Sequence, residues 1–220
     1  MDKMIYTALS GATQNLSRQG VVAHNLANAS THGFKGQLSM YRAVEVNGQG
    51  NHTRSITADT TPSADFSKGI VNHTGRSLDV AIDGDGWLAV ATEDGGEGYT
   101  RDGSLSQDAT GLLTSGGRPV LGAEGQPLVL PLQADITIAA DGTISALGAG
   151  DQPNTLGQVG QLKLVNPLTE TLGRGGDGLF RVRSVDGQPP APVAADDTVR
   201  VTSGALEGSN VSPVGAMVDM

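Results

Sequence analysis

Apolar residues near the start of the chain recur in alternating steps of four and three, over about three heptads. The positions are Ile5, Leu9, Ala12, Leu16, Ala23 and Leu26, with Gln19 in the one vacant place. This repeat predicts a helix over residues 3–28 that carries the apolar seam of a coiled coil. No second long helical pattern follows it. We therefore expect the partner of this seam to be another chain or a segment beyond residue 220.

Small polar residues after this pattern predict where the helix ends. Asn28, Ser30 and Thr31 can bond backbone groups through their side chains, and Gly33 can adopt the positive φ of a C-terminal cap. Phe34 offers an apolar anchor just beyond. The helix surface carries Ser, Thr, Gln and Asn instead of Glu–Lys ladders, so the helix should be marginal alone in water. We expect residues 1–30 to be largely unfolded in an isolated chain.

From residue 77 the apolar period changes to two, which predicts a half-buried strand. The core-facing residues should be Leu78, Val80 and Ile82, and the outward-facing ones Asp79, Ala81 and Asp83. Residues 87–91 form the next predicted strand. Asp-Gly pairs recur beside short apolar runs, at Asp83-Gly84, Asp94-Gly95, Asp102-Gly103, Asp141-Gly142, Asp177-Gly178 and Asp186-Gly187. Such pairs predict β-hairpins with type I′ turns.

The fold class predicted by these patterns is mainly β: an antiparallel β-domain of short hairpins, with an N-terminal coiled-coil-type helix and the start of a C-terminal helix. The predicted segments are an N-terminal assembly helix over residues 1–33, an extended linker over 34–75, the β-domain over 76–204, and a return segment with the start of a truncated C-terminal helix over 205–220. Ser212 as N-cap and Pro213 in the first helical position mark that last helix.

Composition narrows the classes of function. Gly contributes 32 residues and aromatics only 3%, which favours tight turns and a core of small aliphatic side chains. The formal net charge of -9 argues against binding to nucleic acid. Absence of Cys excludes disulfides and thiolate chemistry. With neither a secretory signal pattern nor a membrane-spanning apolar run, we expect a cytoplasmic chain or one exported without a cleaved signal.

No stretch of the chain carries a strong sequence motif for catalysis, nucleotide binding or metal binding. The glycine-rich stretch 173–178 has a dinucleotide-binding spacing, but an alternating strand pattern follows it where a helix would be required, so a hairpin loop is favoured. Asp79, Asp83 and Asp85 crowd a turn without the further ligands of a calcium loop. The four His residues show no i, i+4 ligand pair. We predict no catalytic, cofactor-binding or metal-binding residue, and no enzyme activity.

The stretch after the helix resembles the N-terminal signature of the rod and hook proteins of the bacterial flagellum. The signature residues are Asn25, Leu26, Ala27, Asn28, Ser30, Thr31, Gly33 and Phe34. Further landmarks follow in the family's order, at residues 78–87, 99–103, 138–144 and 206–211. The resemblance covers the whole chain, and residues 1–8 together with a single β-domain are most similar to the proximal rod branch of this family.

The resemblance implies a structural subunit of the basal-body rod, the torque-transmitting axle that crosses the periplasm. Its expected partners are copies of itself and other rod subunits, joined helically through terminal helices with the seam as assembly interface. Passage through the flagellar export apparatus without a cleaved signal is also implied, as are the absence of cofactors, nucleic acid and membrane insertion. An open, head-to-tail interface fits a seam that has no partner in its own chain.

Two alternatives remain open at this point. A distal rod or hook subunit of the same family would share these motifs, and a secreted β-rich adhesin-like module that binds glycans or Ca²⁺ would share the acidic turns. The chain also departs from the family pattern in two places. Relatives are expected to continue for about another helix beyond residue 220, and Gly215 stands where relatives carry Glu, which removes a capping box with Ser212.

Overall fold

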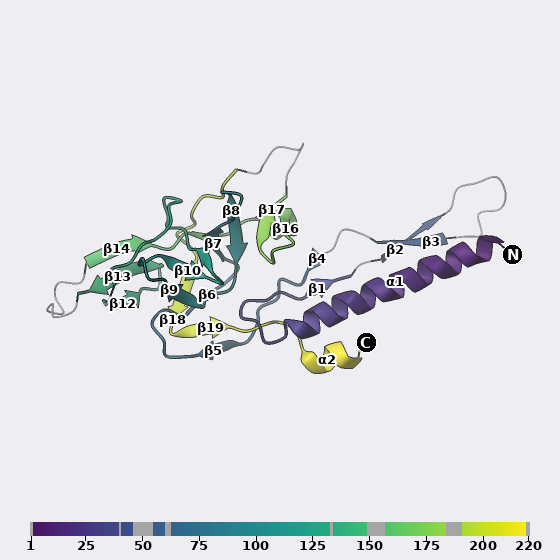
Figure 1. The fold of residues 1–220 in the computed structure, drawn as a ribbon, viewed down its shortest axis with the longest axis horizontal. Coiled ribbons are helices and arrows are strands. Elements are labelled where there is room, and N and C mark those ends of the chain that lie inside the picture. Colours follow the sequence, from purple (N-terminus) through teal and green to yellow (C-terminus); the bar gives the residue numbers. More distant parts are fainter. Residues whose placement is uncertain are drawn as a thin grey trace. The chain divides into compact units, whose positions relative to one another are not determined.

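The computed structural model describes residues 2–39, 41–45, 55–59, 63–132, 134–148, 157–183 and 191–218. The chain forms two compact units (Figure 1). The terminal unit comprises Met1–Ser30, Lys35–Ser67 and Ser209–Met220, and the β unit comprises Thr31–Phe34 and Lys68–Gly208. Each is described by itself below.

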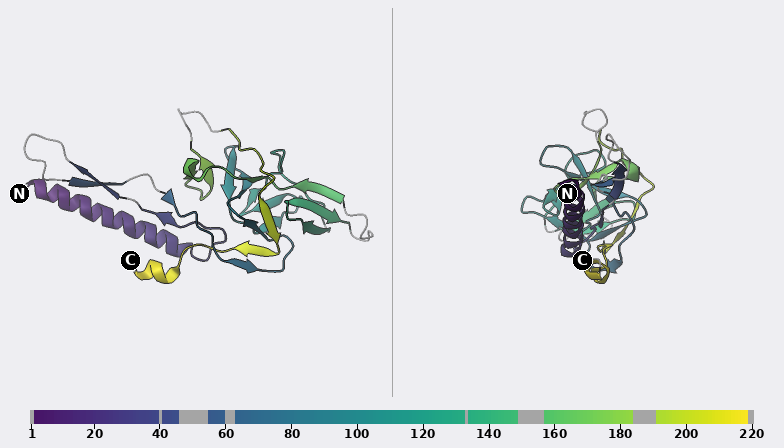
Figure 2. Two further views of the ribbon diagram at one scale, coloured as in Figure 1. Left: turned by 180° about the vertical axis from the view of Figure 1, so that it is seen from behind. Right: turned by 90° about the vertical axis from the view of Figure 1, so that its right-hand side faces the viewer.

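The terminal unit is built on one long helix. Its elements are α1 (Asp2–Ala27), β1 (Gln37–Leu38), β2 (Tyr41–Glu45), β3 (Ser55–Asp59), β4 (Ser63–Ala64) and α2 (Pro213–Val218). Strands β2 and β3 form an antiparallel hairpin, and β1 pairs with β4. Both β3 and α2 contact α1, and the hairpin runs along the helix in Figure 1 and in the left view of Figure 2. The predicted N-terminal helix is confirmed.

The start of α2 follows the predicted capping chemistry, but the predicted cap of α1 is wrong. The helix ends at Ala27, where the Asn28 N–H donates to His24 O at 3.2 Å; Gly33 has the expected positive φ of 65°, but its N–H donates to Glu207 O and not to a carbonyl of the helix. At the start of α2, Ser212 Oγ accepts a hydrogen bond from the Gly215 N–H at 3.3 Å. Ser212 is therefore the N-cap and Pro213 the first helical residue, as the sequence predicts.

The β unit contains a five-stranded antiparallel sheet in the order β15-β7-β8-β17-β16. Its strands are β15 (Leu164–Val165), β7 (Trp87–Ala91), β8 (Glu97–Thr100), β17 (Phe180–Val182) and β16 (Leu172–Arg174). A short 3-10 helix, η2 (Thr169–Thr171), leads into β16. The glycine-rich stretch 173–178 lies in the β16–β17 hairpin, which confirms the prediction of a hairpin loop there.

Smaller antiparallel sheets complete the β unit. One three-stranded sheet joins β11 (Arg118–Pro119), β10 (Leu113–Ser115) and β9 (Leu105–Gln107), and another joins β12 (Asp135–Ile138), β13 (Thr143–Leu147) and β14 (Gly157–Gln161). Two-stranded sheets pair β18 (Arg200–Ser203) with β6 (Val80–Asp83), and β19 (Ala205–Glu207) with β5 (Val71–His73). The predicted mainly antiparallel β fold is thus confirmed.

Small aliphatic side chains from these sheets share one core. Its fully buried members include Leu88, Val90, Leu105, Leu113, Val120 and Ile144. Trp87 packs at the edge of this core with its ring centroid 4.8 Å from that of Phe180. Short strands and few aromatics therefore still enclose a continuous apolar interior, as expected for a chain of this length.

The predicted alternation along β6 is only partly right. Val80 and Ile82 are buried and Asp83 is exposed, but Ala81 and Asp79 are also buried. The carboxylate of Asp79 accepts hydrogen bonds from Thr74 Oγ1 and from the Arg76 guanidinium. Because those donors satisfy the charge, the residue tolerates burial that the sequence pattern alone argued against.

The pairs Asp94-Gly95, Asp141-Gly142 and Asp177-Gly178 lie in hairpins, but the predicted type I′ geometry is wrong for all three. The hairpin prediction is wrong for Asp83-Gly84 and Asp102-Gly103, which connect strands that do not pair with each other, and Asp186-Gly187 lies outside the described residues. Around Gly95, Gly142 and Gly178, the glycine N–H donates to the carbonyl three residues earlier, and the flanking residues pair across a three-residue loop. All three glycines have positive φ, as in a type I turn followed by a G1 bulge. The two-residue loop with positive φ at both positions occurs instead at Gly116-Gly117, between β10 and β11.

Candidate functional site

The amide side chain of Asn25 fixes the strand that follows α1. Its Nδ2 donates to Gln37 O at 2.9 Å, and its Oδ1 accepts a hydrogen bond from the Gln37 N–H at 2.8 Å. Both backbone groups of Gln37 are thus paired as they would be by a neighbouring antiparallel strand. A residue of the predicted signature therefore orients β1 from the last turns of the helix.

A second amide, Asn210, holds the same strand from the C-terminal side. Its Oδ1 accepts a hydrogen bond from the Gly36 N–H at 2.7 Å, and its Nδ2 donates to Asp65 O at 2.7 Å. Between them, Lys35 is 1% exposed and its Nζ donates to Ser67 O at 2.7 Å. We call Asn25 and Asn210 the asparagine clamp, because together they bond the backbone of residues 36 and 37.

Replacing Asn25 by Ala should loosen this clamp without unfolding the helix. The Gln37 N–H and C=O would lose their partners in a partly buried place, at a cost of about 1.5 kcal/mol. Hydrogen exchange of the Gln37 amide should then be about tenfold faster. Asn28→Ala serves as control, since the Asn28 Nδ2 donates to His24 O within the same helix end, at an exposed site. Equal exchange rates at Gln37 in both variants would contradict the assigned role.

Within the β unit, Gly33 makes a contact that no other residue could make. Its N–H donates to Glu207 O at 2.8 Å, and its φ of 65° lies in the left-handed region. A Cβ at this position would lie 2.2 Å from Arg101 C and 2.4 Å from Arg101 O. These are backbone atoms, so a side chain is excluded both by conformation and by space.

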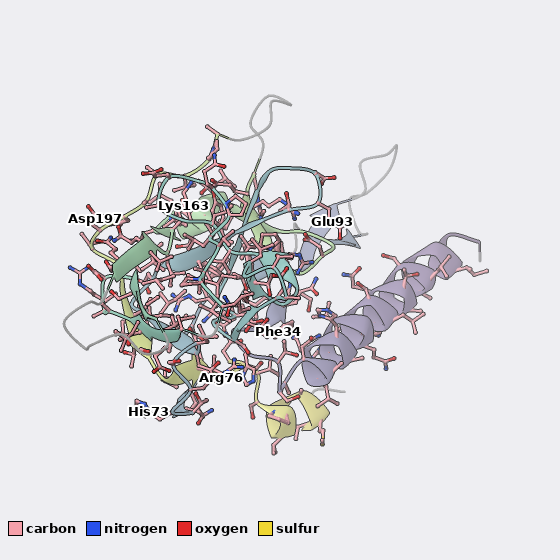
Figure 3. All side chains as sticks on the ribbon, turned by 60° about the vertical axis from the view of Figure 1, so that its left-hand side comes forward. Phe34, His73, Arg76, Glu93, Lys163 and Asp197 are labelled. Atoms are coloured by element: carbon pink, nitrogen blue, oxygen red, sulfur yellow. The ribbon has the colours of Figure 1, made fainter. Side chains whose placement is uncertain are left out.

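Phe34 anchors the next position of the signature. Its side chain is buried (Figure 3), and the guanidinium of Arg174 lies 4.3 Å from its ring centroid. The same guanidinium lies 5.7 Å from the ring of Phe180. A cation between two aromatic rings is stabilised by their quadrupoles, and burial lowers the pKa of Arg174 without removing its charge.

Arg101 and Glu207 form a buried ion pair at the same junction. The Arg101 Nη1 lies 2.9 Å from Glu207 Oε2, and both side chains are at most 3% exposed. The guanidinium also donates to Gly84 O at 2.6 Å and lies 5.4 Å from the Trp87 ring centroid. The other carboxylate oxygen, Glu207 Oε1, accepts a hydrogen bond from the Gly69 N–H at 2.9 Å. We call Gly33, Phe34, Arg101 and Glu207 the signature junction.

Known proteins resemble this chain over its whole length. It is 53% identical over 221 residues to the flagellar basal-body rod protein FlgF of Escherichia coli (strain K12), in an alignment that covers 100% of this chain and 88% of that protein. The chain belongs to the flagellar basal-body rod protein family. The corresponding protein of Salmonella typhimurium is 52% identical with the same coverage, and the rod protein FlgG of Bacillus subtilis is 30% identical, covering 89% of that relative.

Three family profiles match separate parts of this rod protein. The profile described as flagella basal body rod protein matches residues 5–35, and that of the flagellar hook protein FlgE/F/G D1 domain matches residues 81–146. The profile of the flagellar basal body rod FlgEFG protein C-terminal matches residues 202–220. The asparagine clamp and the signature junction join residues from the first and last of these matches. The protein is a structural subunit of the basal-body rod.

The predicted interface residues of this rod subunit share one face of α1. Ile5, Leu9 and Leu16 are 62%, 59% and 69% exposed. Ala12 and Ala23 are also exposed, whereas Leu26 is half-buried. Residues that are partly buried lie largely on the other side of the helix: Ser10, Gln14, Val21 and Asn25. No described element of the chain therefore covers the seam, and its role as an interface stays a prediction.

The remaining signature residues have local roles or none that the structure shows. Asn28 bonds the last turn of α1, and Thr31 O accepts a hydrogen bond from the Phe34 N–H at 3.3 Å. Ala27 and Ser30 are exposed. The signature is thus divided: Asn25 serves the clamp, and Gly33 and Phe34 serve the junction.

Aspartates around the junction have shifted pKa values. Burial raises the pKa of Asp102, and a hydrogen bond from the Ser104 N–H only partly opposes this. Burial would also raise the pKa of Asp79, but hydrogen bonds from Arg76 and Thr74 bring it below its usual value. On the surface, the hydrogen bonds from Arg181 lower the pKa of Asp177 to about 2. Each shift has a structural partner that explains it, and none requires a catalytic role.

Sequence reasoning missed the residues that hold the signature in place. Arg101, Glu207 and Asn210 lie within the landmark stretches, but the sequence assigned them no role. A charged residue next to a run of buried strand residues, as in Leu206-Glu207, was the available signal. Its partner at position 101 lies 106 residues away, which no local pattern could reveal.

Proposed function

We propose that this rod subunit assembles with copies of itself and with other rod subunits through the exposed seam of α1. The main support for this proposal is that Ile5, Leu9 and Leu16 are exposed on one face of α1. The other face of the helix packs against its own chain. Large apolar side chains aligned on one face are typical of a surface that another protein covers. The role is structural and includes no catalytic step.

We place the subunit in the proximal part of the rod. Its identity to relatives named FlgF, at 53% and 52%, exceeds its identity to FlgG of Bacillus subtilis, at 30%. A distal rod or hook position is less well supported, and the matches do not favour an adhesin-like module. Crosslinking in purified basal bodies, followed by identification of the neighbours, would separate proximal from distal placement.

We further infer that the chain is exported by the flagellar apparatus and acts in the part of the basal body that crosses the periplasm. Among the described residues, no helix is both long and apolar enough to cross a membrane. Export is tested by following the chain in cells that lack the flagellar export machinery, where it should stay in the cytoplasm.

The double variant Leu9→Asp/Leu16→Asp should prevent incorporation into basal bodies. Burying carboxylates in an apolar seam costs several kcal/mol, and each ~1.4 kcal/mol lowers an association constant tenfold. We expect the variant in purified basal bodies to fall by about tenfold or more. Ser17→Asp, an exposed change outside the seam, is the matched control. Normal incorporation of the double variant would refute the seam as the assembly interface.

A further inference from the structure

The β unit contains a cavity beside the β7–β8 turn, with a volume of about 370 Å³. An engineered cavity of about 150 Å³ in another protein takes a benzene molecule, so this one has room for an aliphatic side chain. Polar side chains in its lining are those of Glu97 and Tyr99. The rest of the lining consists of small or aliphatic residues: Ala91, Leu121, Pro127, Val182, Ala191, Pro192 and three glycines, Gly95, Gly96 and Gly125. We call it the sheet cavity.

The carboxylate of Glu97 is the polar group that the sheet cavity offers to a ligand. Its Oε1 lies 2.5 Å from Lys163 Nζ, and both side chains are at most 12% exposed. From the described residues, its Oε2 accepts one long hydrogen bond, donated by the Tyr99 hydroxyl at 3.3 Å. That hydroxyl already accepts a hydrogen bond from the Val193 N–H at 3.1 Å. A carboxylate can accept about four hydrogen bonds, so Oε2 retains capacity for a further donor.

Exposed carboxylates lie beside the glycines of the lining. Glu93 and Asp94 come directly before Gly95 in the β7–β8 turn, and Glu124 comes directly before Gly125. In the part of the chain that the structure describes, none of these three acids forms an ion pair. We call Glu93, Asp94 and Glu124 the acidic rim.

Neighbouring cations do not balance the acidic rim. Arg181 and Arg183 flank Val182 along the chain, but successive side chains of a strand point to opposite faces, and Val182 is the one that lines the cavity. Asp94 acts on the charge of Arg181, but that guanidinium is bonded to Asp177 through both of its terminal nitrogens. The charge at the cavity is therefore that of Glu97 and the acidic rim, opposed by the single ammonium group of Lys163.

A lysine side chain has the shape and charge that match this cavity. Its methylene stem packs against apolar walls while its ammonium group acts as a compact positive charge with three donors. Arginine matches less well, because its planar fork pairs with both oxygens of a carboxylate and Lys163 already occupies Oε1 of Glu97. An anionic ligand would be repelled by the acidic rim.

We propose that the sheet cavity receives a lysine side chain from a neighbouring rod subunit. The lysine ammonium donates to Glu97 Oε2, the stem lies against Leu121 and Val182, and the acidic rim attracts the charge as it approaches. This inference rests on the proposed function, since the lysine belongs to another subunit of the rod. It concerns the β unit and makes no use of the seam on α1.

Binding of n-butylammonium to the whole chain tests the chemistry of the cavity, because this probe reproduces the stem and the charge of lysine. At low salt it should shift the amide NMR signals of Gly95 and Gly96 in a saturable manner. Neutral n-butanol should bind about tenfold more weakly, since it lacks the charge. Equal affinity for the two probes would overturn the role given to the carboxylates.

Charge variants locate the site of the probe. Glu93→Gln/Asp94→Asn/Glu124→Gln should weaken n-butylammonium binding about tenfold, because it removes the acidic rim. The matched control makes the same change in net charge at exposed carboxylates elsewhere: Asp135→Asn/Glu170→Gln/Asp197→Asn. If both triple variants bind the probe equally well, the acidic rim is not part of the site and the proposal is wrong.

A second variant tests Glu97 itself. Glu97→Gln/Lys163→Met removes the buried pair as a unit, because a single change would leave one charge buried without its partner. The affinity for n-butylammonium should again fall about tenfold or more. Unchanged affinity would exclude Glu97 as the acceptor.

Crosslinking in purified basal bodies tests the source of the lysine. The chain has no Cys, so Ala191→Cys places a single thiol in the lining. A short reagent that reacts with a thiol at one end and an amine at the other should join this position to a lysine of another rod subunit. Adding Ala91→Leu, which fills the cavity beside Glu97 on the paired strand, should reduce that product about tenfold. Ala139→Leu, at an exposed alanine outside the lining, is the matched control.

The outcomes separate this proposal from the proposed function. A crosslink that Ala91→Leu leaves undiminished would show that the lysine lies outside the cavity. Binding of n-butylammonium without any crosslink to another subunit would assign the cavity to a free amine and overturn the proposed source. In either case, loss of incorporation by Leu9→Asp/Leu16→Asp would still support assembly through the seam.

Discussion

Gly33→Ala should lower the free energy of unfolding by about 2 to 5 kcal/mol, as the sum of two costs. The left-handed φ of 65° costs an L-residue about 1–2 kcal/mol. The new Cβ would also lie 2.2–2.4 Å from backbone atoms of Arg101 and Asp102, so the backbone that follows β8 would have to move. Overpacking of that kind costs about 1–3 kcal/mol. Denaturant titration followed by the fluorescence of Trp87, the only Trp in the chain, measures the loss.

Gly75→Ala separates the two costs. Gly75 has a similar φ of 74°, but a Cβ there meets nothing within 4 Å. Its replacement should cost only the conformational part, about 1–2 kcal/mol. If both variants lose the same stability, the close approach of Gly33 to Arg101 is not what makes glycine necessary.

Arg101→Met should destabilise the β unit by about 3–5 kcal/mol, because it leaves the carboxylate of Glu207 buried without its cation. The lost donor also leaves the carbonyl groups of Ile82 and Gly84 without the guanidinium. Adding Glu207→Gln should recover part of the loss, since Gln is neutral and can still accept the Gly69 N–H. The same denaturant titration applies to both variants.

An ion pair on the surface provides the comparison for the buried ion pair of Arg101 and Glu207. Arg181 and Asp177 are bonded at 2.6 Å, with about a third of each side chain exposed. Arg181→Met should cost at most about 1 kcal/mol, because water screens the charge that remains. A loss for Arg101→Met as small as that for Arg181→Met would contradict the role given to the signature junction, as would failure of Glu207→Gln to recover any stability.

Local patterns accounted for the elements whose causes are local. The apolar repeat from Ile5 to Leu26 predicted α1, and Ser212 with Pro213 predicted the start of α2, because helix periodicity and capping act within a few residues. Asp-Gly pairs marked the β7–β8, β12–β13 and β16–β17 hairpins, but Asp83-Gly84 and Asp102-Gly103 connect strands that do not pair with each other. The type of turn was wrong around Gly142 because loop length depends on which residues pair across the strands, and that pairing is not a property of the dipeptide.

Local sequence patterns could not predict the surroundings of residues whose partners lie far away in the chain. Asp79 has the pattern of an outward-facing residue, yet it is buried. Hydrogen bonds from Thr74 and Arg76 offset the cost of removing its carboxylate from water. The signature was visible as a motif, but the reason for Gly33 lies in the backbone of Arg101. The sequence therefore identified the signature residues of the candidate site, and the structure showed which atoms each of them contacts.

The position of Glu207 along the chain has a kinetic consequence. Its side chain and carbonyl bond residues 33, 69 and 101, so these segments stay unjoined until the polypeptide extends past residue 207. Contacts of such high sequence separation slow folding, because loop-closure entropy is lost before the contacts form. A nascent chain without β19 would hold Arg101 without the carboxylate of Glu207, and Gly33 without the acceptor of its N–H. Completion of the β unit is thereby delayed until the polypeptide has extended past residue 207.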